Sequence, residues 1–279
     1  MLSYRHAFHA GHFADVLKHL VLVQCLDYLT RKDKPLVYID THAGAGGYSL
    51  DSIQARMHRE FDQGIGRLWD CGDLPDPILR YVELVKAFNK TDKLHTYPGS
   101  PWFAKQLLRP QDRLELFELH PADFELLSRN FHKAKRLRLL HEDGFQGCIG
   151  LLPPVERRGL VLMDPAYEVK GDYQQVISTL GKAHRRFQTG TYLIWYPVVE
   201  RQRIDGMERA LKHSGMRDVQ QFELGVRPED RPGMGTCGLF VVNPPWTLLA
   251  NMQSVLPWLA EQLGEDGKGH YRTEVLVGE

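Results

Sequence analysis

Four short apolar runs of this chain each end beside an acidic residue, and segments long enough to form helices separate them. The runs cover residues 35–40, 113–119, 136–140 and 159–163, and the acids are Asp40, Glu118, Asp143 and Asp164. Strands that alternate with helical segments predict an α/β fold with a doubly wound, mostly parallel sheet. Since ligands of such sheets bind beyond the carboxyl ends of the strands, we expect the four acids on one rim.

The second half of the chain extends this sheet. Runs 191–196, 220–226 and 237–242 predict three more strands, and the direct polar loop between the last two predicts a hairpin with an antiparallel edge strand. We therefore expect a Rossmann-like fold with seven strands, formed by a single domain of residues 1–279. An amphipathic helix and a short strand near 271–277 are expected to follow.

A glycine-rich turn, Thr41–Gly47, follows the first strand. It is either a plain tight turn or a loop where the backbone approaches a nucleoside, at Gly44 in particular. An acid that holds the ribose usually follows such glycines by about 20 residues, and Glu118 lies much further along. We therefore predict an inserted helical subdomain at about 50–97. Ser100 is predicted to cap the helix that resumes after it, close to a cofactor cleft.

The loop after the fourth run reads Asp-Pro-Ala-Tyr. Asp164 and the Pro165 carbonyl can each accept an N–H bond from an exocyclic amine, which makes its lone pair available to a methyl donor, and Tyr167 can stack on a base. This pattern is typical of amino-methylating enzymes, although Asp-Pro is also an ordinary turn start. Asn243–Trp246 matches the consensus better, but it follows the antiparallel strand, so we interpret it as structural.

The N-terminal segment 1–20 combines aromatic and cationic side chains that suit bases and phosphates, and we expect Tyr4 and Lys18 to contact RNA. A helix with a buried stripe over residues 22–29 is expected to follow. Histidines at positions 6, 9 and 12 raise the alternative of a metal site. Three ligands at that spacing need a regular helix, which Gly11 disfavours, so no metal is predicted.

The charge composition limits how the chain can bind nucleic acid. Lysine plus arginine and aspartate plus glutamate number 35 each, so any RNA binding must be local. Candidate basic segments are 1–20, 133–138, 184–186 and 227–231, and each could instead be a solvated face. Modest basicity suits a short, naked or early-assembly RNA. Four cysteines without paired spacing favour a reducing cytoplasm, and no apolar run is long enough to span a membrane.

Several longer blocks of the chain are specific enough to compare with known families: Tyr4–Gly11, Ala14–His19, Asp40–Gly46, Tyr97–Pro101, Glu118–Pro121, Asp143–Phe145 and Trp195–Val198. Together they closely resemble the RlmJ family of methyltransferases, and the resemblance runs from Met1 to the C-terminus. The resemblance implies S-adenosylmethionine-dependent methylation of N6 of one adenine in 23S rRNA, by a monomer without an obligate protein partner. A DNA adenine-N6 methyltransferase and a non-catalytic nucleic-acid binder with a decayed site remain alternatives.

The resemblance also implies roles for individual residues. Asp164 is the implied catalytic residue, with Pro165 and Tyr167 beside it, and Tyr4 is implied to meet the RNA. Implied cofactor contacts are His19, His42, Ser100, Glu118, Asp143 and Gly144, to which the glycine turn and the fourth strand end add Gly44 and Asp164. Two positions depart from the family: Ala166 replaces a second proline, and His12 stands where asparagine is expected.

Overall fold

The computed structural model describes residues 5–132, 136–229, 231 and 233–279. Tyr4, part of the basic run 133–138 and part of the loop 227–231 lie outside the described residues. Within the described part of the chain, eight strands form one sheet in the order β10-β8-β9-β7-β6-β1-β4-β5. The strands are β1 (Val37–Asp40), β4 (Arg113–Phe117), β5 (Leu137–Leu140), β6 (Gly159–Met163), β7 (Thr191–Val198), β8 (Val219–Gly225), β9 (Thr236–Val242) and β10 (His270–Val277).

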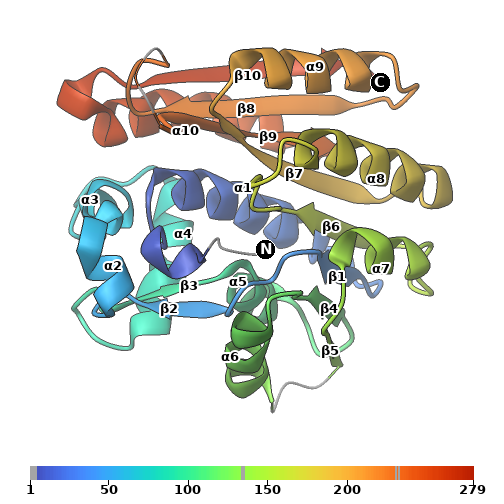
Figure 1. Ribbon diagram of the computed structural model, residues 1–279, viewed down its shortest axis with the longest axis horizontal. Helices are drawn as coiled ribbons and strands as arrows, with labels where there is room; N and C mark the ends of the chain where they lie inside the picture. Colours follow the sequence, from blue (N-terminus) through green and yellow to red (C-terminus); the bar gives the residue numbers. More distant parts are fainter. Residues whose placement is uncertain (1–4, 133–135, 230, 232) are drawn as a thin grey trace.

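The topology is Rossmann-like, as predicted. Strands β5, β4, β1, β6, β7 and β8 point the same way, so their chain order across the sheet is 3-2-1-4-5-6, with antiparallel β9 between the last two. The chain order of the parallel strands reverses between β1 and β6. In sheets of this kind ligands bind at this switch point, beyond the carboxyl ends of the strands. Figure 1 shows β4 and β5 at one end of the sheet and β8 to β10 at the other.

The predicted antiparallel edge strand is wrong in one respect. Strand β9, the predicted 237–242, lies inside the sheet, where it pairs with both β7 and β8. The C-terminal strand β10 pairs antiparallel with β8 and forms the edge, which raises the count among the described residues from seven to eight. The hairpin folds back between its neighbours because every residue of β9 is buried, and an edge position would leave one side of the strand unpaired.

Helices cover both faces of the sheet (Figure 1). One core joins the sheet to α1 (Phe13–Leu29), α4 (Asp76–Asn89), α5 (Ser100–Leu107), α6 (Pro121–Phe131) and α10 (Leu248–Leu263). The other joins it to α7 (Gly144–Gly150), α8 (Asp172–Arg186) and α9 (Arg201–Lys212). Side chains of β1 alternate between them, with Tyr38 in the first core and Ile39 in the second. In the part of the chain described, no helix has the length and apolarity to cross a bilayer.

Helix α1 is buried around most of its circumference. It begins at Phe13, so Lys18 and His19, expected ahead of the helix, lie within it and are themselves buried. The helix contacts α4, α5 and α10 as well as strands β8 and β9, and an amphipathic stripe over 22–29 therefore describes only part of its packing. Polar groups on such a helix must find partners inside the protein.

The insertion adds a small unit beside the main sheet. It contains α2 (Ile53–His58), the 3-10 turn η2 (Glu60–Gln63), α3 (Ile65–Trp69) and α4, and it is bracketed by strands β2 (Gly47–Ser49) and β3 (Thr96–Pro98). The antiparallel β2–β3 pair was missed from the sequence. Helix α5 resumes the fold, but its N-cap is Gly99 rather than the predicted Ser100, whose side chain is used elsewhere.

The buried position of α1 predicts a large stability effect from truncating its core side chains. Leu20 is fully buried, so Leu20→Ala should lower the free energy of unfolding by about 2–5 kcal/mol. Urea unfolding measures this, with Leu79→Ala on α4, whose side chain is 41% exposed, as the matched control. Equal losses in the two variants would contradict the central placement of α1.

Candidate active site

A cavity of about 650 Å³ opens beyond the switch point, at the carboxyl ends of the parallel strands. The loops after β1, β4, β5, β6 and β7 meet the N-terminal segment and α1 around it. All the described residues predicted for the site line it: Lys18, His19, His42, Gly44, Ser100, Glu118, Asp143, Gly144, Asp164, Pro165 and Tyr167. Of the four strand-end acids, Asp40 is absent from this lining.

Asp40 is instead a buried support for the first loop. Its Oδ2 accepts hydrogen bonds from the hydroxyls of Tyr38 and Ser100, each at 2.7 Å, and its Oδ1 accepts the His42 N–H at 3.2 Å. Burial raises the pKa of Asp40 to about 6, partly opposed by the Ser100 and Tyr38 bonds. The Ser100 hydroxyl therefore fixes Asp40 rather than capping α5, and Asp40 fixes the loop that carries His42.

The glycine turn is tied to Glu118, the acid after β4. The Gly44 N–H donates to Glu118 Oε2 at 2.8 Å, and the His120 N–H donates to Oε1 at 2.7 Å. Burial raises the pKa of Glu118, and the two backbone bonds oppose that rise. Gly44 has a φ of +61°, and a Cβ there would collide with the Tyr48 hydroxyl. Each carboxylate oxygen keeps a lone pair for a ligand hydroxyl.

Asp143 performs a capping role that the sequence interpretation missed. Its Oδ1 accepts the Phe145 N–H at 2.8 Å and the Gln146 N–H at 3.4 Å, which makes it the N-cap of α7. The backbone of Gly144 packs against the Thr41 carbonyl with no room for a side chain. The loops after β1 and β5 are thereby held together. Asp143 lines the cavity, and its Oδ2 has only a weak 3.4 Å contact with the Gln146 amide.

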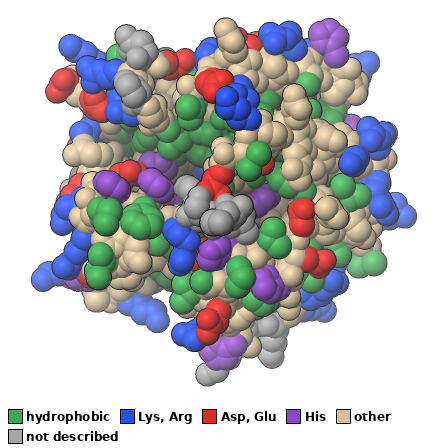
Figure 2. Space-filling view, viewed as in Figure 1, with side chains coloured by type: hydrophobic (Ala, Val, Ile, Leu, Met, Phe, Trp, Pro, Cys, Tyr) green, Lys and Arg blue, Asp and Glu red, His purple; other side chains and the backbone are tan. Residues whose placement is uncertain are grey.

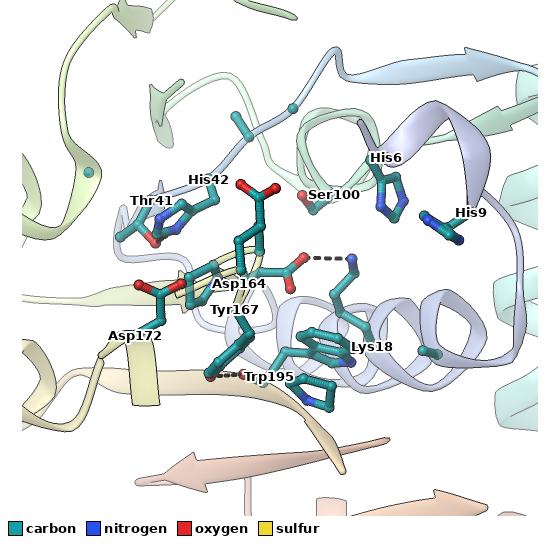
Figure 3. Close-up of a pocket in the computed structure, with 18 of the residues that line it drawn as sticks. His6, His9, Lys18, Thr41, His42, Ser100, Asp164, Tyr167, Asp172 and Trp195 are labelled. Carbon is teal, nitrogen blue, oxygen red and sulfur yellow. Dashed lines mark hydrogen bonds and ion pairs between the residues drawn. The ribbon is translucent and has the colours of Figure 1, made fainter. Parts of the chain in front are cut away.

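Asp164 is held by Lys18, which reaches it from α1 (Figure 3). The Lys18 ammonium lies 2.6 Å from Asp164 Oδ2 and 2.9 Å from Asp15 Oδ1. Burial alone would lower the Lys18 pKa, but the two carboxylates outweigh burial and raise this pKa well above its usual value. Lys18, predicted to contact RNA, thus points inward, because α1 starts early enough to carry it into the interior.

Asp15 and His6 extend this cluster and were both missed from the sequence. Asp15 Oδ2 accepts the Gly11 N–H at 2.8 Å and lies 2.9 Å from His6 Nε2. Burial would raise the Asp15 pKa, but His6 and Lys18 hold it well below its usual range. The available signal was the i, i+3 spacing of Asp15 and Lys18, which places both on one face of a helix.

Tyr167 is fixed at the edge of the cavity. Its backbone has a φ of +54°, and its hydroxyl donates to the Trp195 carbonyl at 2.6 Å, while its ring lies 4.6 Å from that of Tyr173. Ala166, between Pro165 and Tyr167, is exposed. With alanine in place of the family's second proline, Asp164 and Tyr167 both line the cavity.

Two histidines of the cavity are neutral hydrogen-bonding groups. His19 Nδ1 lies 2.8 Å from the Tyr97 hydroxyl, and its buried Nε2 has no hydrogen-bond partner among the described residues. Burial lowers the pKa of His19 well below its usual value and that of His42 to about 4. An unpartnered buried nitrogen costs free energy, so His19 Nε2 is suited to a ligand that supplies the missing bond.

The competing motif at Asn243–Trp246 is structural, as expected. The Asn243 side-chain amide donates to the carbonyls of Gln188 and Gly190 at 2.8 and 2.7 Å. Because β9 is antiparallel, these residues follow its carboxyl end at the rim opposite the cavity. Trp246 is 80% exposed there.

A sheet of this topology with an Asp-Pro-Ala-Tyr loop lining the cavity at its rim is typical of the methyltransferase class. Sequence comparison makes the class specific: the family model described as Ribosomal RNA large subunit methyltransferase D, RlmJ, matches residues 33–277. The chain belongs to that family.

Similar proteins cover the whole chain. Two proteins named Ribosomal RNA large subunit methyltransferase J match it over 100% of both chains: one from Escherichia coli K12 is 50% identical over 280 residues, and one from Haemophilus influenzae is 47% identical over 281 residues. A crystal structure of a protein from Legionella pneumophila superposes with a TM-score of 0.90 at 39% identity, covering 96% of this chain and 98% of that one.

The raised pKa of Asp40 predicts a pH dependence of stability. Between about pH 4 and pH 6 the unfolded chain has lost this proton while the folded protein retains it, so stability falls as pH rises through that window. Asp40→Asn should remove this decrease, which is about 3 kcal/mol. Urea unfolding across pH 4 to 7 measures the slope, with the exposed Asp33→Asn as control. An unaltered slope in Asp40→Asn would contradict the assignment.

Proposed function

We propose that this protein transfers the methyl group of S-adenosylmethionine to N6 of one adenine in 23S rRNA. The observation that carries the proposal is the Asp164 carboxylate, held at 2.6 Å by the Lys18 ammonium beside Pro165 and Tyr167 in a cavity of about 650 Å³. A cavity of that size suits a nucleoside donor together with a base. The names of the two full-length relatives support ribosomal RNA as the substrate.

The residues around the cavity fit the donor. Glu118 suits the ribose diol, Asp143 Oδ2 suits the adenine amino group, and the unpartnered His19 Nε2 offers a further hydrogen bond. His42, Gly44, Ser100 and Gly144 complete the proposed contacts. S-adenosylmethionine supplies a methyl group on a positively charged sulfur. The acidic residues of the cavity favour such a cation, while the neutral histidines do not repel it.

The protein's own groups prepare the amine. Asp164 and the Pro165 carbonyl accept its two N–H bonds, which localises the nitrogen lone pair, and Tyr167 packs against the base. Lys18 holds Asp164 in position, and because its pKa is raised it stays an ammonium rather than a base. The proton that N6 loses when the N–C bond forms is taken up by Asp164 and passes to water.

RNA contacts are local in this proposal. Equal numbers of acidic and basic residues give no general attraction to a polyanion. Figure 2 shows lysine and arginine side chains mainly toward the margins of one face and histidines nearer its middle. This distribution supports a naked or early-assembly RNA as the substrate, because a short flipped-out segment needs fewer phosphate contacts than an assembled particle.

Labelled methyl transfer tests the proposal directly. With purified protein, N6-methyladenine should appear in naked 23S transcript, to a smaller extent in assembled large subunits, and not in DNA of the same sequence. Asp164→Ala should lower kcat by about 10²–10³. Transfer to DNA alone would favour a DNA methyltransferase, and an unimpaired Asp164→Ala variant would mean that the site is not catalytic.

Lys18 is expected to act on Asp164 rather than on the substrate. Lys18→Met should lower kcat by about 100-fold, as expected for a misplaced catalytic group, with a smaller change in KM for RNA. The exposed Lys182→Met is the control. Removing one partner of a buried ion pair costs about 3–5 kcal/mol, so Lys18→Met alone loses stability. A Lys18→Met/Asp15→Asn variant removes one charge of each sign and so keeps the native net charge of the cluster. Its kcat should remain low, and a native kcat in that folded variant would contradict the positioning role.

A further inference from the structure

The insertion is in direct contact with segment 6–12, which leads into α1, although the proposed chemistry uses no residue of the insertion. The segment contains the 3-10 turn η1 (His6–Phe8), which packs against α2. The ring of His6 lies 4.9 Å from that of Tyr48 on β2. His6 and His9 lie on the Lys18 side of the cavity (Figure 3). The insertion therefore supports a segment whose histidines line the reaction cavity.

Two backbones meet without space for a side chain where the insertion touches this segment. The Ile65 N–H donates to the Gly11 carbonyl at 2.8 Å. A Cβ added at Gly64 would lie 2.2 Å from that carbonyl oxygen and 2.6 Å from the backbone of His12. Gly11 has a φ of +83°, and a Cβ there would lie 3.0 Å from Ile65 and 3.2 Å from Phe61. Glycine at both positions permits this close approach, so the insertion fixes the position of Gly11.

A side-chain contact holds the same segment from the preceding turn. His9 Nδ1 lies 2.9 Å from Glu60 Oε2 on η2. The hydrogen bond to Glu60 raises the pKa of His9, and burial partly opposes that rise. The two side chains are 36% and 33% exposed, so a substitution of Glu60 disturbs the packing less than one of Gly64.

Gly11 connects this support to the Asp164 carboxylate. The Gly11 N–H donates to Asp15 Oδ2 at 2.8 Å, and Asp15 Oδ1 lies 2.9 Å from the Lys18 ammonium. That ammonium holds Asp164 at 2.6 Å. Because Asp15 is buried, a displaced Gly11 would either move its carboxylate or deprive it of a donor. A continuous series of contacts therefore runs from Ile65 to Asp164.

We propose that Gly64 and Glu60 are positioning residues for methyl transfer, which fix segment 6–12 and, through Gly11 and Asp15, the orientation of the Asp164 carboxylate. This role rests on the proposed function for the identity of the reaction. It gives the insertion a part in catalysis without contact with the donor or the base. A misplacement of about 1 Å by a distant change can cost about 100-fold in rate, so a carboxylate that must meet one N–H bond needs such a support.

Gly64→Ala tests the backbone contact. It should lower kcat for methyl transfer to 23S transcript by about 10- to 100-fold, with a smaller change in KM. The number of S-adenosylmethionine molecules bound per chain should stay as in the native protein, because a displaced carboxylate slows the chemical step. Partial unfolding would instead lower kcat and the number of bound donors together. Gly72→Ala, in the same insertion, is the matched control, since an added Cβ there meets no described atom within 4 Å.

Glu60→Ala keeps the backbone contact and decides the question if Gly64→Ala does not fold. It should lower kcat by about two- to fivefold, the range for a partly exposed ion pair. Glu60→Gln keeps an acceptor for the His9 ring and should recover part of that loss. Asp62→Ala, on the same turn, removes the partner of Arg59 rather than of His9, and its kcat should equal the native value.

Hydrogen–deuterium exchange separates this role from the proposed function. The Gly11 amide and the first turn of α1 should exchange about tenfold faster in Gly64→Ala, with the amides of β8 and β9 unchanged. If the native protein transfers no methyl group, the proposed function is wrong, and the exchange rates still decide whether the insertion holds segment 6–12. Native exchange at Gly11 in the Gly64 and Glu60 variants would overturn the positioning role. Faster exchange combined with a native kcat would overturn it as well.

Discussion

The rest of the site depends on a buried cation between two carboxylates. Lys18 loses hydration on α1, and attraction to Asp15 and Asp164 compensates for that loss. Removing Lys18 would leave two carboxylates without their shared countercharge in a region of low dielectric. The same contacts join α1 to the loop after β6, across a separation of 146 residues. The position of the first helix and the orientation of the Asp164 carboxylate are therefore set by one interaction.

The sequence predicted those features that follow from strand direction. Parallel strands end on the same rim, so apolar runs with acids at their ends placed Glu118, Asp143 and Asp164 around one cavity without any knowledge of side-chain contacts. The partners of these acids were not predictable in the same way. Glu118 is bonded by two backbone N–H groups and Asp143 by a helix terminus, and such contacts depend on loop conformation rather than on residue type.

Contacts between segments far apart in the sequence explain the remaining differences between the prediction and the structure. The hairpin of β8 and β9 was evident from its turn, but whether β9 pairs with β7 or stays at the edge is decided by packing across the whole sheet. Ser100 had the local features of a helix cap, and its hydroxyl instead bonds Asp40, 60 residues away. Lys18 carried the charge expected of an RNA contact, but a start of α1 at Phe13 turned it inward. In each case tertiary contacts replaced a local preference.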